Sequence, residues 1–146
     1  DAKASVYSSG EYKIIIFAPS LTGVQDNNLS AVKTAQQISE NLNSYNKKFA
    51  LKINFGIGVN SGILIAEKMK DRFRFTPVGN TVIAARKLAV HSHEDVLISD
   101  ALYRKVTGTV RCEKAHGISA WKIVKVIDRS RHHGFVGGIY GKAVGR

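Results

Sequence analysis

Two adjacent cationic residues, Arg86 and Lys87, are well suited to chemistry on a phosphorylated substrate. Their charges could meet a triphosphate, whose oxygens gather negative charge when a bond to phosphorus forms or breaks. Lys and Arg on a helix are more often part of a solvated face. The motifs around the pair must therefore decide between a functional and a purely structural role.

The segment 55–86 reads FGIGVNSGILIAEKMKDRFRFTPVGNTVIAAR. An apolar strand leads to a glycine-bounded turn, a second strand, an aromatic-Thr pair and a Gly-Asn pair that opens a helix. This order resembles the substrate-side half of a class III adenylate/guanylate cyclase catalytic domain. The positions that match the family pattern are Gly56, Ile57, Gly62, Phe75, Thr76, Gly79, Asn80 and Val82.

The resemblance continues on both sides of this segment. YSSGEYKIIIFAP at 7–19 is similar to the family's metal-bearing hairpin, VLISDALYRKV at 96–106 to a strand and short helix, and HGISAWKIVKV at 116–126 to the closing hairpin. The family's first strand, with its Phe-x-Asp-Ile-x-x-Phe-Thr signature and first metal-binding aspartate, is absent. We therefore interpret the chain as N-terminally incomplete.

The resemblance assigns substrate-binding positions to Thr76, Tyr7 and Ile83. Thr76 falls where the family contacts the base, and Tyr7 replaces its purine-recognising lysine. Ile83 replaces the asparagine that carries the ribose and orients the nucleophile, and on a helix face it is most simply a core residue. Arg86 or Lys87 falls at the family's phosphate-facing arginine, so this pair supplies the candidate catalytic residues.

Glu11 takes the position of the family's second metal-binding aspartate. Its extra methylene moves the carboxylate by about 1 Å, which costs on the order of 100-fold where geometry is tight. A glutamate in an exposed strand turn is the competing interpretation. We expect no cofactor for this chain, and Mg²⁺ or Mn²⁺ if it is active.

These substitutions imply a catalytically degenerate class III cyclase homology domain, a dimerising or nucleotide-sensing module in intracellular signalling rather than an enzyme. The family's active site forms between two subunits, so we expect a homodimer, or a heterodimer with another cyclase-like domain, with ATP or GTP as a possible ligand. The alternative is an active cyclase, converting ATP or GTP to a cyclic nucleotide and pyrophosphate when complete or paired with an intact partner.

Charge adds a third hypothesis, a basic nucleic-acid-binding domain. The 146 residues include 22 Lys and Arg against 11 Asp and Glu, a net charge of +11 that attracts nucleotides, nucleic acids and anionic lipids alike. No recognition motif accompanies this charge, so any nucleic-acid binding should be non-specific. The single cysteine, Cys112, is typical of a reducing compartment, and the apolar runs are too short to span a membrane. We expect a cytoplasmic domain without membrane contact.

The pattern of elements predicts an α+β fold, a cyclase-homology (ferredoxin-like) sheet with helices packed on it. We expect one domain over 1–128, followed by a basic, Gly-rich tail or linker at 129–146. Strands are predicted at 12–17, 52–58, 63–66, 109–112 and 121–127. Helices should follow caps at 26–28, at Asn80 and at Ser99, and the first of them, the single helix between Phe17 and Gly56, has apolar residues at positions 29, 32, 35, 38, 42 and 45.

Short connections then predict the geometry of the site. Segment 55–66 should form a hairpin beside the helix at 80–90, because strands joined by a short turn pair with each other. Thr76, Arg86 or Lys87 should line a cleft, with Glu11 on an adjacent strand of the same sheet. In a symmetric dimer, Glu11 should lie nearer the partner subunit's Arg86 than its own.

Overall fold

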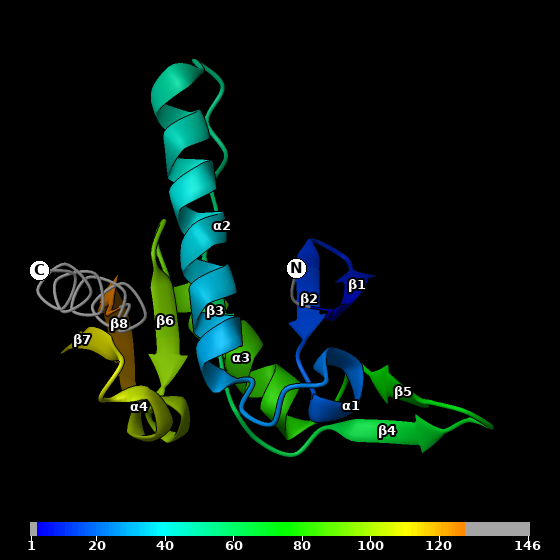
Figure 1. Ribbon diagram of the computed structural model, residues 1–146. Coiled ribbons are helices and arrows are strands. Elements are labelled where there is room, and N and C mark those ends of the chain that lie inside the picture. Colours follow the sequence, from blue (N-terminus) through cyan, green and yellow to red (C-terminus); the bar gives the residue numbers. More distant parts are fainter. Residues whose placement is uncertain (1–2, 128–146) are drawn as a thin grey trace, which may run out of the picture.

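The computed structural model describes residues 3–127 as an α+β arrangement, so the predicted fold class is confirmed (Figure 1). The tail predicted at 129–146 lies outside these residues. The elements in chain order are β1 (Ser5–Ser9), β2 (Tyr12–Ile16), α1 (Pro19–Thr22), α2 (Asn28–Lys48), β3 (Ile57–Val59), β4 (Ile65–Lys68), β5 (Phe73–Thr76), α3 (Asn80–His91), β6 (Val96–Ser99), α4 (Asp100–Val106), β7 (Val110–Lys114) and β8 (Ala120–Val126).

The strands form three hydrogen-bonded groups rather than the one predicted sheet. The largest is a four-stranded sheet with the order β3-β6-β8-β7, in which β3 runs parallel to β6 and the other neighbours are antiparallel. The β1–β2 and β4–β5 hairpins form two separate antiparallel pairs. None of the helices formed by residues 3–127 is long and apolar enough to cross a membrane.

The predicted hairpin at 55–66 is wrong. β3 pairs with β6, and β4 pairs with β5 instead. The chain between β3 and β4 is fixed to the start of α3, because the Asn60 side-chain amide donates to the Thr81 carbonyl (3.1 Å) and the Thr81 hydroxyl donates to the Ile63 carbonyl (2.6 Å). These two bonds hold the connection in an extended path, so β4 leaves β3 and does not fold back onto it.

The predicted position of Glu11 is also wrong. The β1–β2 hairpin forms as expected, with Gly10 in the left-handed region at φ +59°, and Glu11 lies exposed in its turn. However, no hydrogen-bonded ladder joins this hairpin to the sheet that contains β3. Glu11 is therefore not on an adjacent strand of the same sheet as β3.

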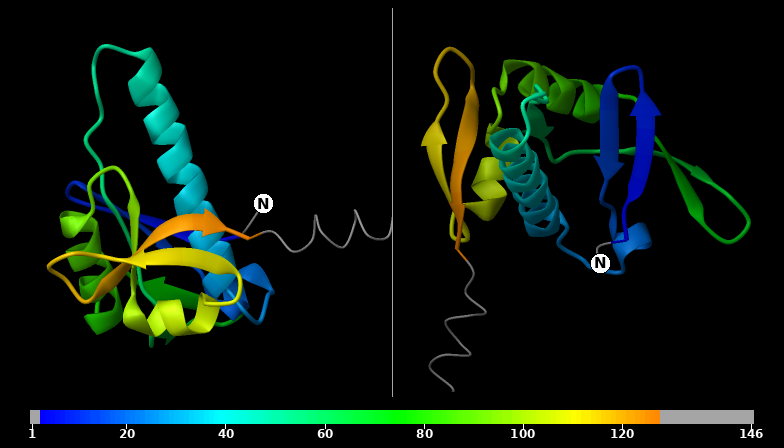
Figure 2. Two further views of the ribbon diagram at one scale, coloured as in Figure 1. Left: turned by 90° about the vertical axis from the view of Figure 1, so that its left-hand side faces the viewer. Right: turned by 90° about the horizontal axis from the view of Figure 1, so that it is seen from above.

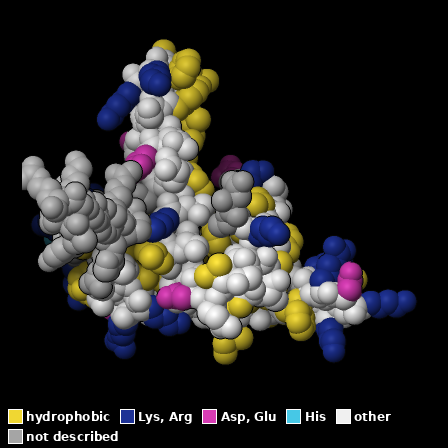
Figure 3. Space-filling view, in the orientation of Figure 1, with side chains coloured by type: hydrophobic (Ala, Val, Ile, Leu, Met, Phe, Trp, Pro, Cys, Tyr) yellow, Lys and Arg dark blue, Asp and Glu magenta, His cyan; other side chains and the backbone are white. Residues whose placement is uncertain are grey.

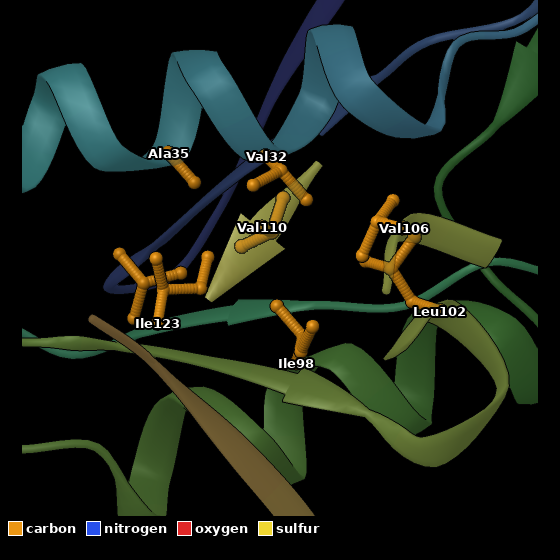
Figure 4. Close-up of a cluster of buried hydrophobic side chains, with 8 residues drawn as sticks. Val32, Ala35, Ile98, Leu102, Val106, Val110 and Ile123 are labelled. Atoms are coloured by element: carbon orange, nitrogen blue, oxygen red, sulfur yellow. The ribbon is translucent and has the colours of Figure 1, made fainter. Parts of the chain in front are cut away.

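The core lies between α2 and the four-stranded sheet. Two turns of α2 bury Val32 and Ala35 against side chains from β6, α4, β7 and β8 (Figure 4). Burial of this apolar surface fixes α2 across the sheet. The residues that complete the cluster are Val96, Ile98, Leu102, Val106, Val110 and Ile123.

The helix boundaries differ in detail from the predictions. Two helices rather than one separate Phe17 from Gly56, because Pro19 opens the short α1 and Gly23, at φ +71°, ends it. Gly79, not Asn80, occupies the N-cap of α3. The predicted cap of α4 is confirmed, since the Ser99 hydroxyl accepts a hydrogen bond from the Leu102 backbone N–H at 3.2 Å.

Candidate functional site

Gly58 in β3 and Gly56, directly before this strand, set the position of α3. A Cβ atom at Gly58 would overlap the Ala85 carbonyl oxygen, and one at Gly56 would overlap the Ala89 carbonyl oxygen. The backbone of α3 therefore lies directly on the backbone of this segment, which explains in physical terms why the sequence has glycine at both places. Val82 and Leu88 of α3 are buried, and Leu88 packs with Leu97 and Ala120 in a second apolar cluster. The remaining faces of α3 are more exposed.

Those faces carry three of the sequence-predicted site residues together. Ile83, Arg86 and Lys87 line one cavity of about 280 Å³. Ile83 is 48% exposed there, so the interpretation of this side chain as core is wrong. The other lining residues are Tyr12, Val90 and His91.

Arg86 is held by an aromatic side chain that the sequence interpretation missed. Its guanidinium carbon lies 4.3 Å from the centroid of the Tyr12 ring, within the range of a cation–π contact. Tyr12 directly follows Glu11, so α3 contacts the β1–β2 hairpin within one chain. The alternation of β2 could have placed Tyr12 and Ile14 on one face of the strand, but nothing local in the sequence indicates a contact with α3.

The two predicted base-binding positions lie near each other but outside this cavity. The Tyr7 hydroxyl donates to the Phe75 carbonyl at 2.6 Å, which joins β1 to β5 next to Thr76. Thr76 itself pairs with Ile65 in the β4–β5 ladder and is absent from the cavity lining. The structure thus brings Tyr7 and Thr76 together, and separately Ile83, Arg86 and Lys87.

The carboxylates do not form the two-metal centre that the resemblance implies. Within residues 3–127, no group of three or more His, Cys, Asp or Glu side chains is placed to hold a metal ion, and Glu11 lies exposed in its turn. Two metals need several oxygen ligands that converge on one point. The described residues therefore do not fit a two-metal centre.

A larger hollow of about 520 Å³ lies where β2, α1, α2 and the β4–β5 hairpin approach one another. Its lining combines aromatic, small and amide side chains without any charged residue, which suits it poorly to a triphosphate. The lining residues are Phe17, Ala18, Pro19, Ser20, Gln25, Asn27, Asn28, Ser61, Gly62, Leu64, Ala66, Phe73 and Phe75.

The clearest pKa shifts occur away from the cavity. The Trp121 indole N–H donates to Asp100 at 3.1 Å, and this bond, together with Arg104 2.8 Å away, lowers the pKa of the Asp100 carboxyl. Burial raises the pKa of the Cys112 thiol, so less reactive thiolate is present at a given pH. Asp100 joins α4 to β8 through Trp121, and Cys112 of β7 packs against the buried core cluster.

No protein-family profile matches the sequence, and no curated protein sequence is significantly similar to it. Solved structures do match. The monomeric guanylyl cyclase domain of the RhoGC fusion protein from the aquatic fungus Blastocladiella emersonii is 23% identical, with a TM-score of 0.64 over 83% of this chain and 71% of that one. A dimeric form of that domain is 21% identical, with a TM-score of 0.67 over 84% and 72%.

A second protein gives the same result. The guanylate cyclase domain of RhGC from Catenaria anguillulae, solved in complex with GTP, is 24% identical, with a TM-score of 0.60 over 84% of this chain and 73% of that one. At this level of identity the likeness concerns the fold. The described residues therefore have the fold of a class III nucleotide cyclase catalytic domain.

Proposed function

We propose that this chain is a non-catalytic cyclase homology domain that works as a dimerising, nucleotide-sensing module in signalling inside the cell. The observation that carries the proposal is the place of Ile83, half-exposed in the cavity beside Arg86 and Lys87. An alkyl side chain cannot hydrogen-bond a ribose hydroxyl or orient it as a nucleophile. The position best placed to direct the reaction therefore lacks the required group, while the cationic groups remain.

The cationic side chains that remain at the site support nucleotide binding without turnover. Arg86 is oriented by the Tyr12 ring, and Lys87 lines the same cavity. Arg and Lys side chains bind phosphate oxygens through charge-assisted hydrogen bonds. ATP or GTP is the expected ligand, and its phosphates would occupy the open side of α3.

Exposed apolar side chains support the dimerising role. The β4–β5 hairpin projects from the body of the molecule (Figure 1). Its residues Ile65 and Phe73 are 50% and 47% exposed, and Val90 on α3 is 61% exposed. Apolar groups gathered on projecting elements are typical of protein–protein contacts. Another cyclase-like domain, identical or different, is the expected partner.

An activity assay tests the loss of catalysis. The purified chain, incubated with ATP or GTP and Mg²⁺ or Mn²⁺, should give no cyclic nucleotide by mass spectrometry. The double variant Glu11→Asp and Ile83→Asn should also remain inactive, because a second carboxylate to hold two metals is still missing. Turnover by the unmodified chain would contradict the proposal.

The retained Arg86 and Lys87 favour one alternative, in which the chain completes the site of an intact cyclase domain. Mixing the chain with such a domain distinguishes the two functions. An increase in cyclic product that is lost in the Arg86→Ala, Lys87→Ala double variant would support the alternative. Unchanged product formation, with nucleotide still bound by the chain, would support the non-catalytic module.

A further inference from the structure

The C-terminal end of α2 projects from the rest of the described molecule. The residues that α2 adds to the buried core cluster, Val32 and Ala35, lie in its first half. Figure 1 and the left view of Figure 2 both show the second half rising beyond the strands, with the following chain returning alongside it. Every residue from 47 to 54 is exposed. We refer to residues 45–53 as the α2 tip.

The α2 tip exposes large apolar side chains. Leu51 is 80% exposed, Phe49 52% and Ile53 40%. Phe49 stacks on Tyr45 with 4.5 Å between the ring centroids, so the two rings form one apolar surface. Figure 3 shows hydrophobic side chains gathered at this end of α2. Gathered apolar surface of this kind marks a contact with a partner molecule or a membrane.

The α2 tip is also basic. Lys47, Lys48 and Lys52 are exposed among the apolar residues. The Lys52 ammonium group donates to the Asn46 carbonyl, which holds its charge at the end of the helix. No Asp or Glu occurs in the sequence from residue 41 to residue 66. Among residues 3–127, none of the three lysines forms an ion pair, so their charges are available to an anionic partner.

A buried side chain fixes the conformation of the α2 tip. The Asn46 side-chain amide donates to the Ile53 carbonyl, and its oxygen accepts from the Ile53 backbone N–H, both at 2.8 Å. These bonds close the loop that carries Phe49 and Leu51. The apolar and basic side chains are therefore presented by a preformed loop, which reduces the entropy lost on binding.

We propose that the α2 tip binds the surface of a lipid bilayer that contains anionic phospholipids. Leu51 and Phe49 enter the boundary between head groups and acyl chains, and the lysines contact the negatively charged head groups. The long lysine side chains allow this, because their alkyl parts lie along apolar surface while the ammonium groups stay in the polar layer. A projecting tip can enter the soft boundary of a bilayer without a matching hollow.

A bilayer accounts for the side chains of the α2 tip better than a nucleic acid does. Nucleic acids bind lysine through phosphate and stack their bases on free aromatic faces. One face of Phe49 is already covered by Tyr45, and the most exposed apolar side chain, Leu51, is aliphatic. The sequence predicted no membrane contact because its apolar runs are too short to span, but a surface contact needs no spanning segment.

This inference is independent of the proposed nucleotide role, because the α2 tip shares no residue with the cavity at α3. Vesicle flotation with the full chain tests it. The chain should float with vesicles of phosphatidylcholine and about one third phosphatidylserine, and much less with phosphatidylcholine alone.

Two charge variants locate the contact. Lys47→Gln with Lys48→Gln should weaken binding to the anionic vesicles about 30-fold, because each lysine near such a surface contributes about fivefold. Lys68→Gln with Lys70→Gln lowers the net charge equally at exposed positions of the β4–β5 hairpin. This control should bind nearly as tightly as the unmodified chain.

A second pair of variants tests the apolar contact at constant charge. Phe49→Ser with Leu51→Ser should weaken vesicle binding at least about tenfold, because less apolar surface leaves water. The control, Val6→Ser with Ile63→Ser, changes side chains that are 64% and 92% exposed elsewhere and should have no effect. If the first double variant loses its circular dichroism signal, Leu51→Ser alone replaces it, since this change keeps Phe49 stacked on Tyr45.

The variant Leu51→Trp reports insertion directly. Vesicles with brominated lipid should quench its fluorescence more than that of the unmodified chain, which contains Trp121. Absence of vesicle binding, equal binding to neutral vesicles, or equal losses in the tip variants and their controls would overturn the proposal. Association of the chain without vesicles that Leu51→Ser abolishes would also overturn it, because a second copy would then cover the tip.

Discussion

At the scale of single residues, Gly58 controls the distance between β3 and α3. Gly58→Ala forces the new Cβ into the Ala85 carbonyl oxygen, so α3 must shift. We expect the variant to lower the free energy of unfolding by about 1–3 kcal/mol, the usual range for overpacking. Chemical denaturation monitored by circular dichroism measures the change.

Gly10 provides the matched control, since no atom lies within 4 Å of its missing Cβ. Gly10→Asn keeps a residue that tolerates its positive φ, and it should cost less than about 1 kcal/mol. Equal stability of Gly58→Ala and the unmodified protein would show that α3 does not rest on β3 as described.

The cap at Ser99 was predictable because a serine before a short helix indicates its own role. The close approach of α3 to Gly56 and Gly58 was not predicted, because it depends on packing between distant segments. The contact between Tyr12 and Arg86 was not predictable, because it joins residues that are far apart in the sequence. The same long-range packing decides that Ile83 is exposed, although its place on an apolar-rich helix favours burial.

At the scale of elements, the Ser99 cap should contribute measurably to α4. Ser99→Ala removes the acceptor for the Leu102 N–H and should lower the free energy of unfolding by about 1 kcal/mol. The control is Ser44→Ala in α2, an exposed position where alanine is the better helix former, so stability should hold or rise slightly. The urea denaturation midpoint of each variant is compared with that of the unmodified chain. At equal slope, the difference in midpoint measures the change in stability. A Ser99→Ala midpoint equal to that of the unmodified chain would contradict the capping role.

Element types were easier to predict than element partners. The periodicity of β2, α2, α3 and β8 is local, and these elements form close to their expected places. Strand pairing depends on contacts between distant segments, and for that reason the prediction of a hairpin at 55–66 was wrong. Asn60 and Thr81 hold the connection in place through bonds that span about 20 residues of sequence, and only the folded chain shows them.

At the scale of the whole molecule, the projecting β4–β5 hairpin should drive association. Sedimentation of the unmodified chain should reveal a concentration-dependent dimer. Phe73→Asp should raise the dissociation constant at least about tenfold, because it places a charge among contacting apolar side chains. Val124→Asp, with a similarly exposed valine on β8, should dimerise normally. A monomer at every concentration would contradict the dimerising role and leave nucleotide binding as the part of the proposal to test.

The charge of the whole molecule leads to a prediction about polyanions. With a net charge of +11, the chain should bind single-stranded DNA and RNA weakly and without sequence preference. If about four phosphates are neutralised, the affinity for a single strand should fall about 50-fold between 50 mM and 200 mM salt. Fluorescence anisotropy with two unrelated sequences of equal length measures both the affinity and the discrimination. Affinity that persists at high salt and differs between the two sequences would instead favour the nucleic-acid-binding hypothesis, because base contacts, unlike phosphate contacts, depend on sequence and release few counterions.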